Sequence, residues 1–222
     1  MVRMRVLGAV ELAIGSRRIG MNTESLFALA LYLSVRAGER VSREDLLSLF
    51  WTKGTEAQQR HALRQMLYRL RQKGCSLDEE GDWVRLDAAR VDSDLRTALS
   101  AEWIEQATAA QVDAAAQFMP TFSRKMAPNF VAWLDEIREL LSSQHRKAAH
   151  LQIVVARREG RWSDLERWAQ AVLRTDPLNE EATLARAESA AMAGSKTIAM
   201  EILDTLSLIH ISEPTRLRRI SY

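Results

Sequence analysis

Residues 55–74, TEAQQRHALRQMLYRLRQKG, contain a long run in which every charged side chain from 57 to 73 is basic. The apolar residues Leu63, Met66, Leu67 and Leu70 follow the i, i+3, i+4, i+7 spacing of one buried helical stripe. Gly74 then stands where a C′ glycine ends a helix. The spacing predicts an amphipathic helix over 57–73. Its basic residues are Arg60, Arg64, Arg69, Arg71 and Lys73.

Taken alone, a basic helix is more often an ordinary solvated surface than a binding site. The residues before it therefore matter. Segments 2–6 and 10–14 alternate apolar and polar side chains, as half-buried strands do, and Gly15-Ser16 fits a two-residue type II′ hairpin turn. We expect a small antiparallel sheet at the N-terminus.

Two further helices are expected between this sheet and the basic helix. Residues 26–35 are apolar almost all round, with Asn22 or Thr23 as N-cap and Gly38 at the end. Ser42 reads as the N-cap of a second helix to about Trp51, with Asp45 at its third position. A short polar loop leads from there into the basic helix.

Two short strand candidates, 75–77 and 83–86, follow Gly74, joined by an acidic turn over 78–82. The order of strands, three helices and a hairpin is that of the winged helix-turn-helix, whose third helix enters the major groove of DNA. A DNA-binding domain over 1–91 is therefore predicted. For base contacts we expect Gln58, His61, Arg64, Gln65 and Tyr68, and for phosphate contacts Lys53, Arg69, Arg71, Lys73 and Arg85.

Beyond about Val91 the pattern changes to helices without strands, so the fold class is mainly α with a small β component. Residues 92–206 are expected to form an all-α domain. Phe130 and Trp133 begin a long helix in it and should pack into the core. Gly160 and Gly194 lie one tetratricopeptide period apart, which favours a tetratricopeptide-like arrangement.

The last 16 residues, 207–222, break this helical pattern at Ser207 and match nothing upstream in composition. We expect them to be a non-native tail and draw no function from their three arginines.

Composition excludes several classes. The single cysteine, Cys75, rules out a disulfide framework, and four scattered histidines do not make a zinc cluster. No stretch is apolar enough to cross a membrane, and no signal peptide is evident, so a cytoplasmic protein without membrane contact is expected. The residues carry no catalytic constellation, so we expect no enzyme activity and no cofactor.

Three segments of the first half, residues 4–12, 41–51 and 62–74, resemble the DNA-binding half of the SARP type of bacterial transcriptional activator. Phe130-x-x-Trp133 and Asp176-Pro177-Leu178-x-x-Glu181-Ala182 are similar to the helical activation domain that follows it in that family. The resemblance spans about 3–206. It implies double-stranded DNA as a partner, binding as a homodimer or on tandem repeats, and contact with RNA polymerase subunits.

The hairpin departs from that family, because its tip is acidic where a minor-groove contact would use Arg or Lys. We expect no wing contact beyond Arg85. Two other functions stay open: a protein-interaction scaffold whose winged helix does not bind DNA, and a fragment of a larger regulatory ATPase.

Overall fold

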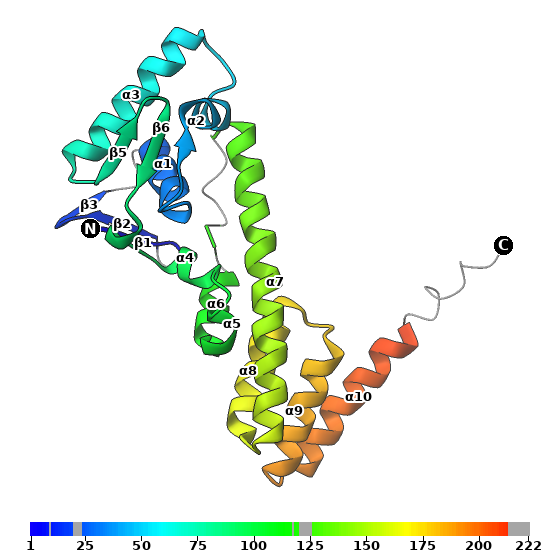
Figure 1. Cartoon of the computed structure of the whole chain (residues 1–222). Helices are drawn as coiled ribbons and strands as arrows, with labels where there is room; N and C mark the ends of the chain where they lie inside the picture. The colour runs from blue at the N-terminus through cyan, green and yellow to red at the C-terminus, as the bar shows by residue number, and fades with distance from the viewer. Residues whose placement is uncertain (9, 20–23, 117, 120–125, 213–222) are drawn as a thin grey trace. The chain divides into compact units, whose positions relative to one another are not determined.

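The computed structural model describes residues 1–8, 10–19, 24–116, 118, 119 and 126–212, and Figure 1 shows the chain with its elements labelled. The chain divides into two compact units: Met1–Ala101 with Ala114–Ser142, and Glu102–Asp113 with Ser143–Tyr222. Among the expected features, the N-cap at Asn22 or Thr23 lies outside the described residues.

The first unit opens with a four-stranded sheet in the order β3-β2-β1-β7. Ile14 faces Arg17 across the β2–β3 turn, and Gly15 in that turn has a φ of 62°, so the expected two-residue hairpin is confirmed. Val2, Met4 and Leu12 point into the core and are almost fully buried. The strands are β1 (Val2–Arg5), β2 (Glu11–Ile14), β3 (Arg17–Ile19) and β7 (Val91–Ser93).

Strand β7 pairs in parallel with β1, so the expectation of helices without strands from Val91 is wrong for its first residues. A short 3-10 turn (Ala88–Arg90) precedes β7, and α4 (Asp94–Ala98) follows it and contacts β1. The compact unit that holds this sheet comprises Met1–Ala101 and Ala114–Ser142, whereas the predicted DNA-binding domain covers residues 1–91.

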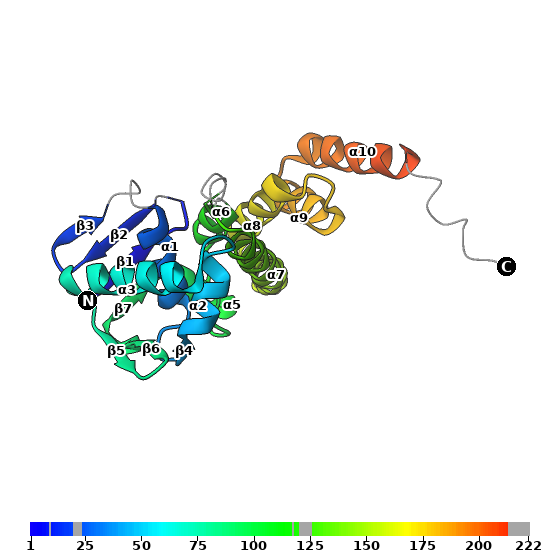
Figure 2. The same cartoon turned by 90° about the horizontal axis from the view of Figure 1, so that it is seen from above.

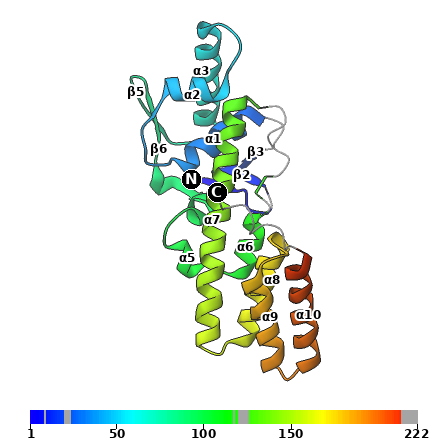
Figure 3. The ribbon, with the colours of Figure 1, turned by 90° about the vertical axis from the view of Figure 1, so that its right-hand side faces the viewer.

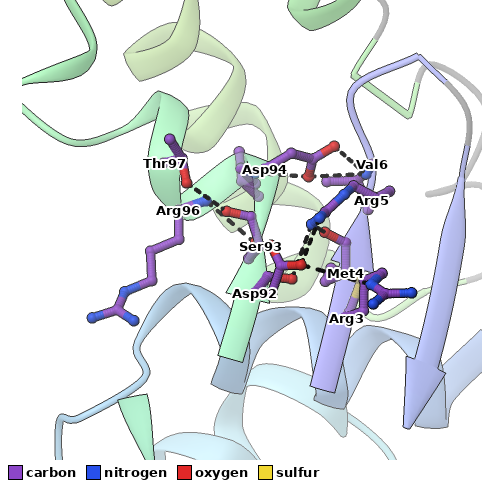
Figure 4. Close-up of polar contacts among 10 residues, drawn as sticks. Arg3, Met4, Arg5, Val6, Asp92, Ser93, Asp94, Arg96 and Thr97 are labelled. Atoms are coloured by element: carbon purple, nitrogen blue, oxygen red, sulfur yellow. Dashed lines mark hydrogen bonds and ion pairs between the residues drawn. The ribbon is translucent and has the colours of Figure 1, made fainter. Parts of the chain in front are cut away.

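Partly buried polar contacts join β7 and the start of α4 to β1 and the residues that follow it (Figure 4). The Asp94 carboxylate accepts hydrogen bonds from the backbone N–H groups of Val6 at 3.0 Å and Leu7 at 3.1 Å. Burial raises the pKa of Asp94, while these backbone donors oppose that change. Next to it, Arg5 donates to Asp92 at 2.6 Å, and this bond lowers the pKa of Asp92.

Helix α1 (Glu24–Val35) contacts β1, β7 and the second sheet, and its residues 26–34 are all buried, as its apolar surface predicts. Helix α1 lies between the two sheets of this unit (Figure 2). Ser42 caps α2 (Arg43–Phe50) by accepting from the N–H of Asp45 at 2.9 Å, which confirms the expected cap.

The second sheet has the order β4-β6-β5 and forms the wing. Its strands are β4 (Val41–Ser42), β5 (Leu77–Glu80) and β6 (Trp83–Leu86). The turn holds only Gly81 and Asp82, since Glu80 already faces Trp83 in the ladder. The acidic turn expected over 78–82 is therefore wrong: Asp78, Glu79 and Glu80 belong to β5.

Aromatic side chains pack the start of a long helix against the core of the first unit. The long helix α7 (Pro128–Arg158) begins in this unit and buries Phe130 against Phe50, with ring centroids 5.1 Å apart. Trp133 lies 5.0 Å from the ring of Tyr32. The predicted core role of Phe130 is confirmed, and Trp133 is half-buried beside it.

The second unit is all α. Figure 3 shows α8 (Trp162–Thr175), α9 (Glu180–Met192) and α10 (Lys196–Ser212) side by side, and α9 contacts both neighbours. Two shorter helices precede α7: α5 (Trp103–Gln106) and α6 (Ala109–Ala116). Gly160 and Gly194 each follow a helix end by two residues and have a positive φ. The expected break at Ser207 is wrong, because α10 continues to Ser212.

Candidate nucleic-acid interface

The basic segment forms α3 (Glu56–Gln72), and its start is fixed by a capping box. The Thr55 hydroxyl accepts from the N–H of Gln58 at 3.4 Å, and the Gln58 side-chain oxygen accepts from the N–H of Thr55 at 3.0 Å. Two backbone donors that the first turn would leave unpaired are thereby satisfied. The helix starts at a defined residue.

The end of α3 is equally defined. The N–H of Gly74 donates to the carbonyl of Arg71 at 2.8 Å, and the N–H of Cys75 donates to the carbonyl of Leu70 at 3.0 Å. With Gly74 at a φ of 94°, this is a Schellman motif, which needs the left-handed conformation that glycine adopts readily. Cys75 is buried, and burial raises the pKa of its thiol to about 11.

Between these caps, α3 divides into a core face and a solvent face. Leu63, Met66, Leu67 and Leu70 are buried against the first unit's core, as their spacing predicts. The residues expected to contact bases are all exposed: Gln58, His61, Arg64, Gln65 and Tyr68. The major groove of DNA admits a helix whose long polar face is exposed while its opposite face packs in the protein core.

The exposed side chains differ in whether they already make contacts within the protein. The side-chain oxygen of Gln58 is bound in the capping box, and the Gln65 amide nitrogen lies 2.9 Å from Nε2 of His61. Tyr68 is 55% exposed. Arg64 has no ion-pair partner among the described residues. Among the residues expected to contact bases, Arg64 is therefore a charged side chain that can bind a ligand without breaking an ion pair within the described part of the protein.

The five cations expected at phosphates fall into two classes. Within the described part of the chain, Lys53, Arg69 and Lys73 have no ion-pair partner; Lys53 and Arg69 are exposed and Lys73 is half-buried. Arg71 lies 3.3 Å from Glu79, and Arg85 lies 2.9 Å from Asp78. This division is not visible in the sequence, because both carboxylate partners lie in β5 and meet these arginines only in the folded hairpin and helix.

An open groove of about 1340 Å³ lies between α2, α3 and the wing. One flank of α3 lines it with Arg60, Arg64 and Arg71. Across the groove, the wing contributes Glu79 and Trp83, which is 44% exposed. Arg60 pairs with Glu56 at 2.6 Å. Four arginines and five carboxylates line the groove, so it is close to electrically balanced. Sequence analysis missed Arg43, Glu79 and Trp83 as neighbours of this helix, because only the tertiary fold brings them there.

The described residues contain no group of three or more His, Cys, Asp or Glu side chains that could hold a metal ion. No helix in this part of the chain is long and apolar enough to cross a membrane.

Together these features define a winged helix-turn-helix unit joined to an all-α part. No protein-family model matches the chain, and neither does any curated protein. Among solved structures, the chain is similar to Mycobacterium tuberculosis EmbR in complex with a low affinity phosphopeptide, with a TM-score of 0.56 at 14% sequence identity. The match covers 96% of this chain and 60% of the EmbR chain. At this identity the likeness concerns the fold, and this chain spans about three fifths of that neighbour.

Proposed function

We propose that the protein is a sequence-specific DNA-binding transcriptional regulator of the SARP type, an activator by that resemblance. The observation that carries the proposal is the solvent face of α3, where Arg64 and Arg69 have no ion-pair partner among the described residues while the opposite face holds the core. Lys73, at the C-cap, has none either within this part of the chain. A helix anchored in this way can enter a groove about 12 Å wide without disturbing its own domain.

In this proposal α3 lies in the major groove. Arg64 and Gln65 read base edges, because Arg and Gln make paired hydrogen bonds to guanine and adenine. His61 and Tyr68 lie on the same exposed face and border those contacts. Lys53, Arg69 and Lys73 bind phosphates and set the register of the helix on the duplex. Arg71 and Arg85 contribute less, since each already contacts a carboxylate.

The helical part would contact the transcription machinery, with RNA polymerase subunits as the partner that the family resemblance implies. A homodimer, or two copies on tandem repeats, follows from the same resemblance. These partners rest on the sequence motifs around Phe130 and Asp176 and on a fold shared with EmbR.

The test is a salt titration of binding to a fluorescent DNA duplex, followed by anisotropy. The logarithm of the binding constant should fall linearly with the logarithm of salt concentration, because each neutralised phosphate releases counterions. Arg69→Ala should lower the slope by about 1. Arg158→Ala, which removes an exposed arginine from the second unit, is the matched control and should leave the slope unchanged.

A wild-type protein that shows no salt-dependent binding would contradict the proposal. The winged helix would then serve as a protein-docking domain.

A further inference from the structure

Glu79, in the middle of β5, shares its carboxylate between two arginines from different helices. Nη2 of Arg43, at the start of α2, donates to one oxygen, Oε2. Nη1 of Arg71, near the end of α3, lies 3.3 Å from the other oxygen, Oε1. The wing is thus tied to both helices of the helix-turn-helix through one side chain.

The pair of Glu79 with Arg43 is better shielded from water than the other ion pairs of the wing. The side chain of Glu79 is 19% exposed and that of Arg43 is 22% exposed, whereas that of Arg71 is 48% exposed. By contrast, Asp78 with Arg85 and Glu80 with Arg40 are open pairs on the surface. Open pairs are worth little and give way easily to a competing anion, whereas breaking a partly buried pair is costly.

Oε1 of Glu79 is the atom that Arg71 would have to leave in order to bind a DNA phosphate. This oxygen is buried and accepts no hydrogen bond from any described residue, and the charge of Arg71 lies 3.3 Å from it. If Arg71 turned away to a DNA phosphate, Oε1 would lose this electrostatic compensation, and the carboxylate would keep only its contact with Arg43 through Oε2. Removing one partner of a partly buried charge is costly.

We propose that Glu79 limits the overall affinity for DNA by keeping Arg71 away from the DNA backbone, and this inference rests on the proposed DNA-binding function. Phosphate contacts add affinity for every sequence alike, while base contacts discriminate. By removing one cation from the phosphate-binding set, Glu79 lowers binding to arbitrary DNA and leaves base reading by Arg64 and Gln65 unchanged. Glu79 therefore lowers the affinity for every sequence by the same factor, and the ratio of specific to non-specific affinity stays the same.

A double-mutant cycle on the full chain tests this inference, with a duplex of arbitrary sequence and a salt titration. Arg71→Ala alone should leave the salt slope close to that of the wild type. Glu79→Gln should steepen the slope by about 0.9 and tighten non-specific binding roughly threefold to tenfold, because one more phosphate is neutralised. Adding Arg71→Ala to Glu79→Gln should return both quantities to the wild-type values.

The control for net charge is Glu188→Gln. Glu188 is also a carboxylate paired with an arginine, Arg157 at 2.7 Å, but in the second unit. It should leave the slope unchanged. An equal gain from Glu188→Gln would show a general charge effect and overturn the inference.

The salt slope of Arg71→Ala tests the inference even if Glu79→Gln does not fold. If Arg71→Ala lowers the slope as much as Arg69→Ala does, Arg71 binds phosphate in the wild type, and Glu79 does not keep it from the DNA backbone. An unchanged slope in a folded Glu79→Gln variant would overturn the inference as well. If the wild-type protein shows no salt-dependent DNA binding at all, the proposed function itself is rejected.

Discussion

The side-chain oxygen of Gln58 accepts a hydrogen bond from the backbone N–H of Thr55, and the Thr55 hydroxyl accepts one from the N–H of Gln58. These two hydrogen bonds cap the N-terminus of α3, which is the end that would approach the bases. The role of Gln58 is therefore first structural, and any base contact by it has to use the amide nitrogen or give up the cap.

Thr55→Ala should lower the free energy of unfolding by about 1 kcal/mol, because an N-cap oxygen is lost. Urea unfolding followed by circular dichroism measures the change. Thr55→Ser keeps the hydroxyl and should stay within a few tenths of a kcal/mol of the wild type. Equal losses in the two variants would show that the hydroxyl does not stabilise the helix.

Arg64→Ala should relax base preference at one or two positions of the binding site, at a cost of roughly 1–3 kcal/mol for the preferred base. Selection from a library of random duplexes, followed by sequencing, gives the preference of each variant position by position. Arg69→Ala should weaken binding to all sequences and keep the preferences. Unchanged preferences in Arg64→Ala would contradict its assignment to base reading.

Asp94→Ala should destabilise the first unit by roughly 1–3 kcal/mol, because the N–H groups of Val6 and Leu7 would lose their acceptor in a partly buried place. Asp94→Asn should cost less, since its amide oxygen still accepts a hydrogen bond and no charge is buried. Urea unfolding measures both variants. Asp92→Ala removes the neighbouring, more exposed carboxylate and should cost about 0–1 kcal/mol.

His145 should make the stability of the second unit fall with decreasing pH. Burial lowers the pKa of His145 to about 4 from an ordinary value of 6.5. The unfolded chain therefore binds a proton between pH 6.5 and 4 that the folded chain does not, so the free energy of unfolding drops through this range. The loss should approach about 3 kcal/mol at most once the pH is below 4.

Urea unfolding at a series of pH values measures this effect, and His145→Phe should remove most of it. The ring of His145 lies 5.4 Å from that of Trp103, so phenylalanine can keep the aromatic packing. His150→Gln, on the exposed side of the same helix, is the control and should keep the pH dependence. A pH dependence that His145→Phe leaves intact would assign the effect to other groups.

Local patterns predicted most of the first unit correctly. The stripe from Leu63 to Leu70, the cap at Ser42 and the Gly15-Ser16 turn depend on residues a few positions apart, and each is confirmed. Strand β7 was missed because its partner is β1, and a parallel pairing between distant segments leaves no local signal. The two-residue strand β4 is too short to show a period.

The candidate site was predictable only in part. Exposure of Gln58, His61, Arg64, Gln65 and Tyr68 follows from helical periodicity alone. Their internal contacts do not: Gln58 was predicted to contact bases, whereas its side-chain oxygen is bound in the capping box. The pairing of Arg43 with Glu79 joins residues 36 positions apart, and a sequence cannot say which of many acids an arginine meets.

The pairing of β7 with β1 also has a consequence for synthesis on the ribosome. Arg5 and Asp92 are 87 residues apart, so one edge of β1 cannot be paired until β7 has been made. At about 5–20 residues per second, the nascent chain carries that open strand edge for roughly 5–20 s. An unpaired edge attracts other strands, so newly made chains depend on protection during this interval more than finished ones do.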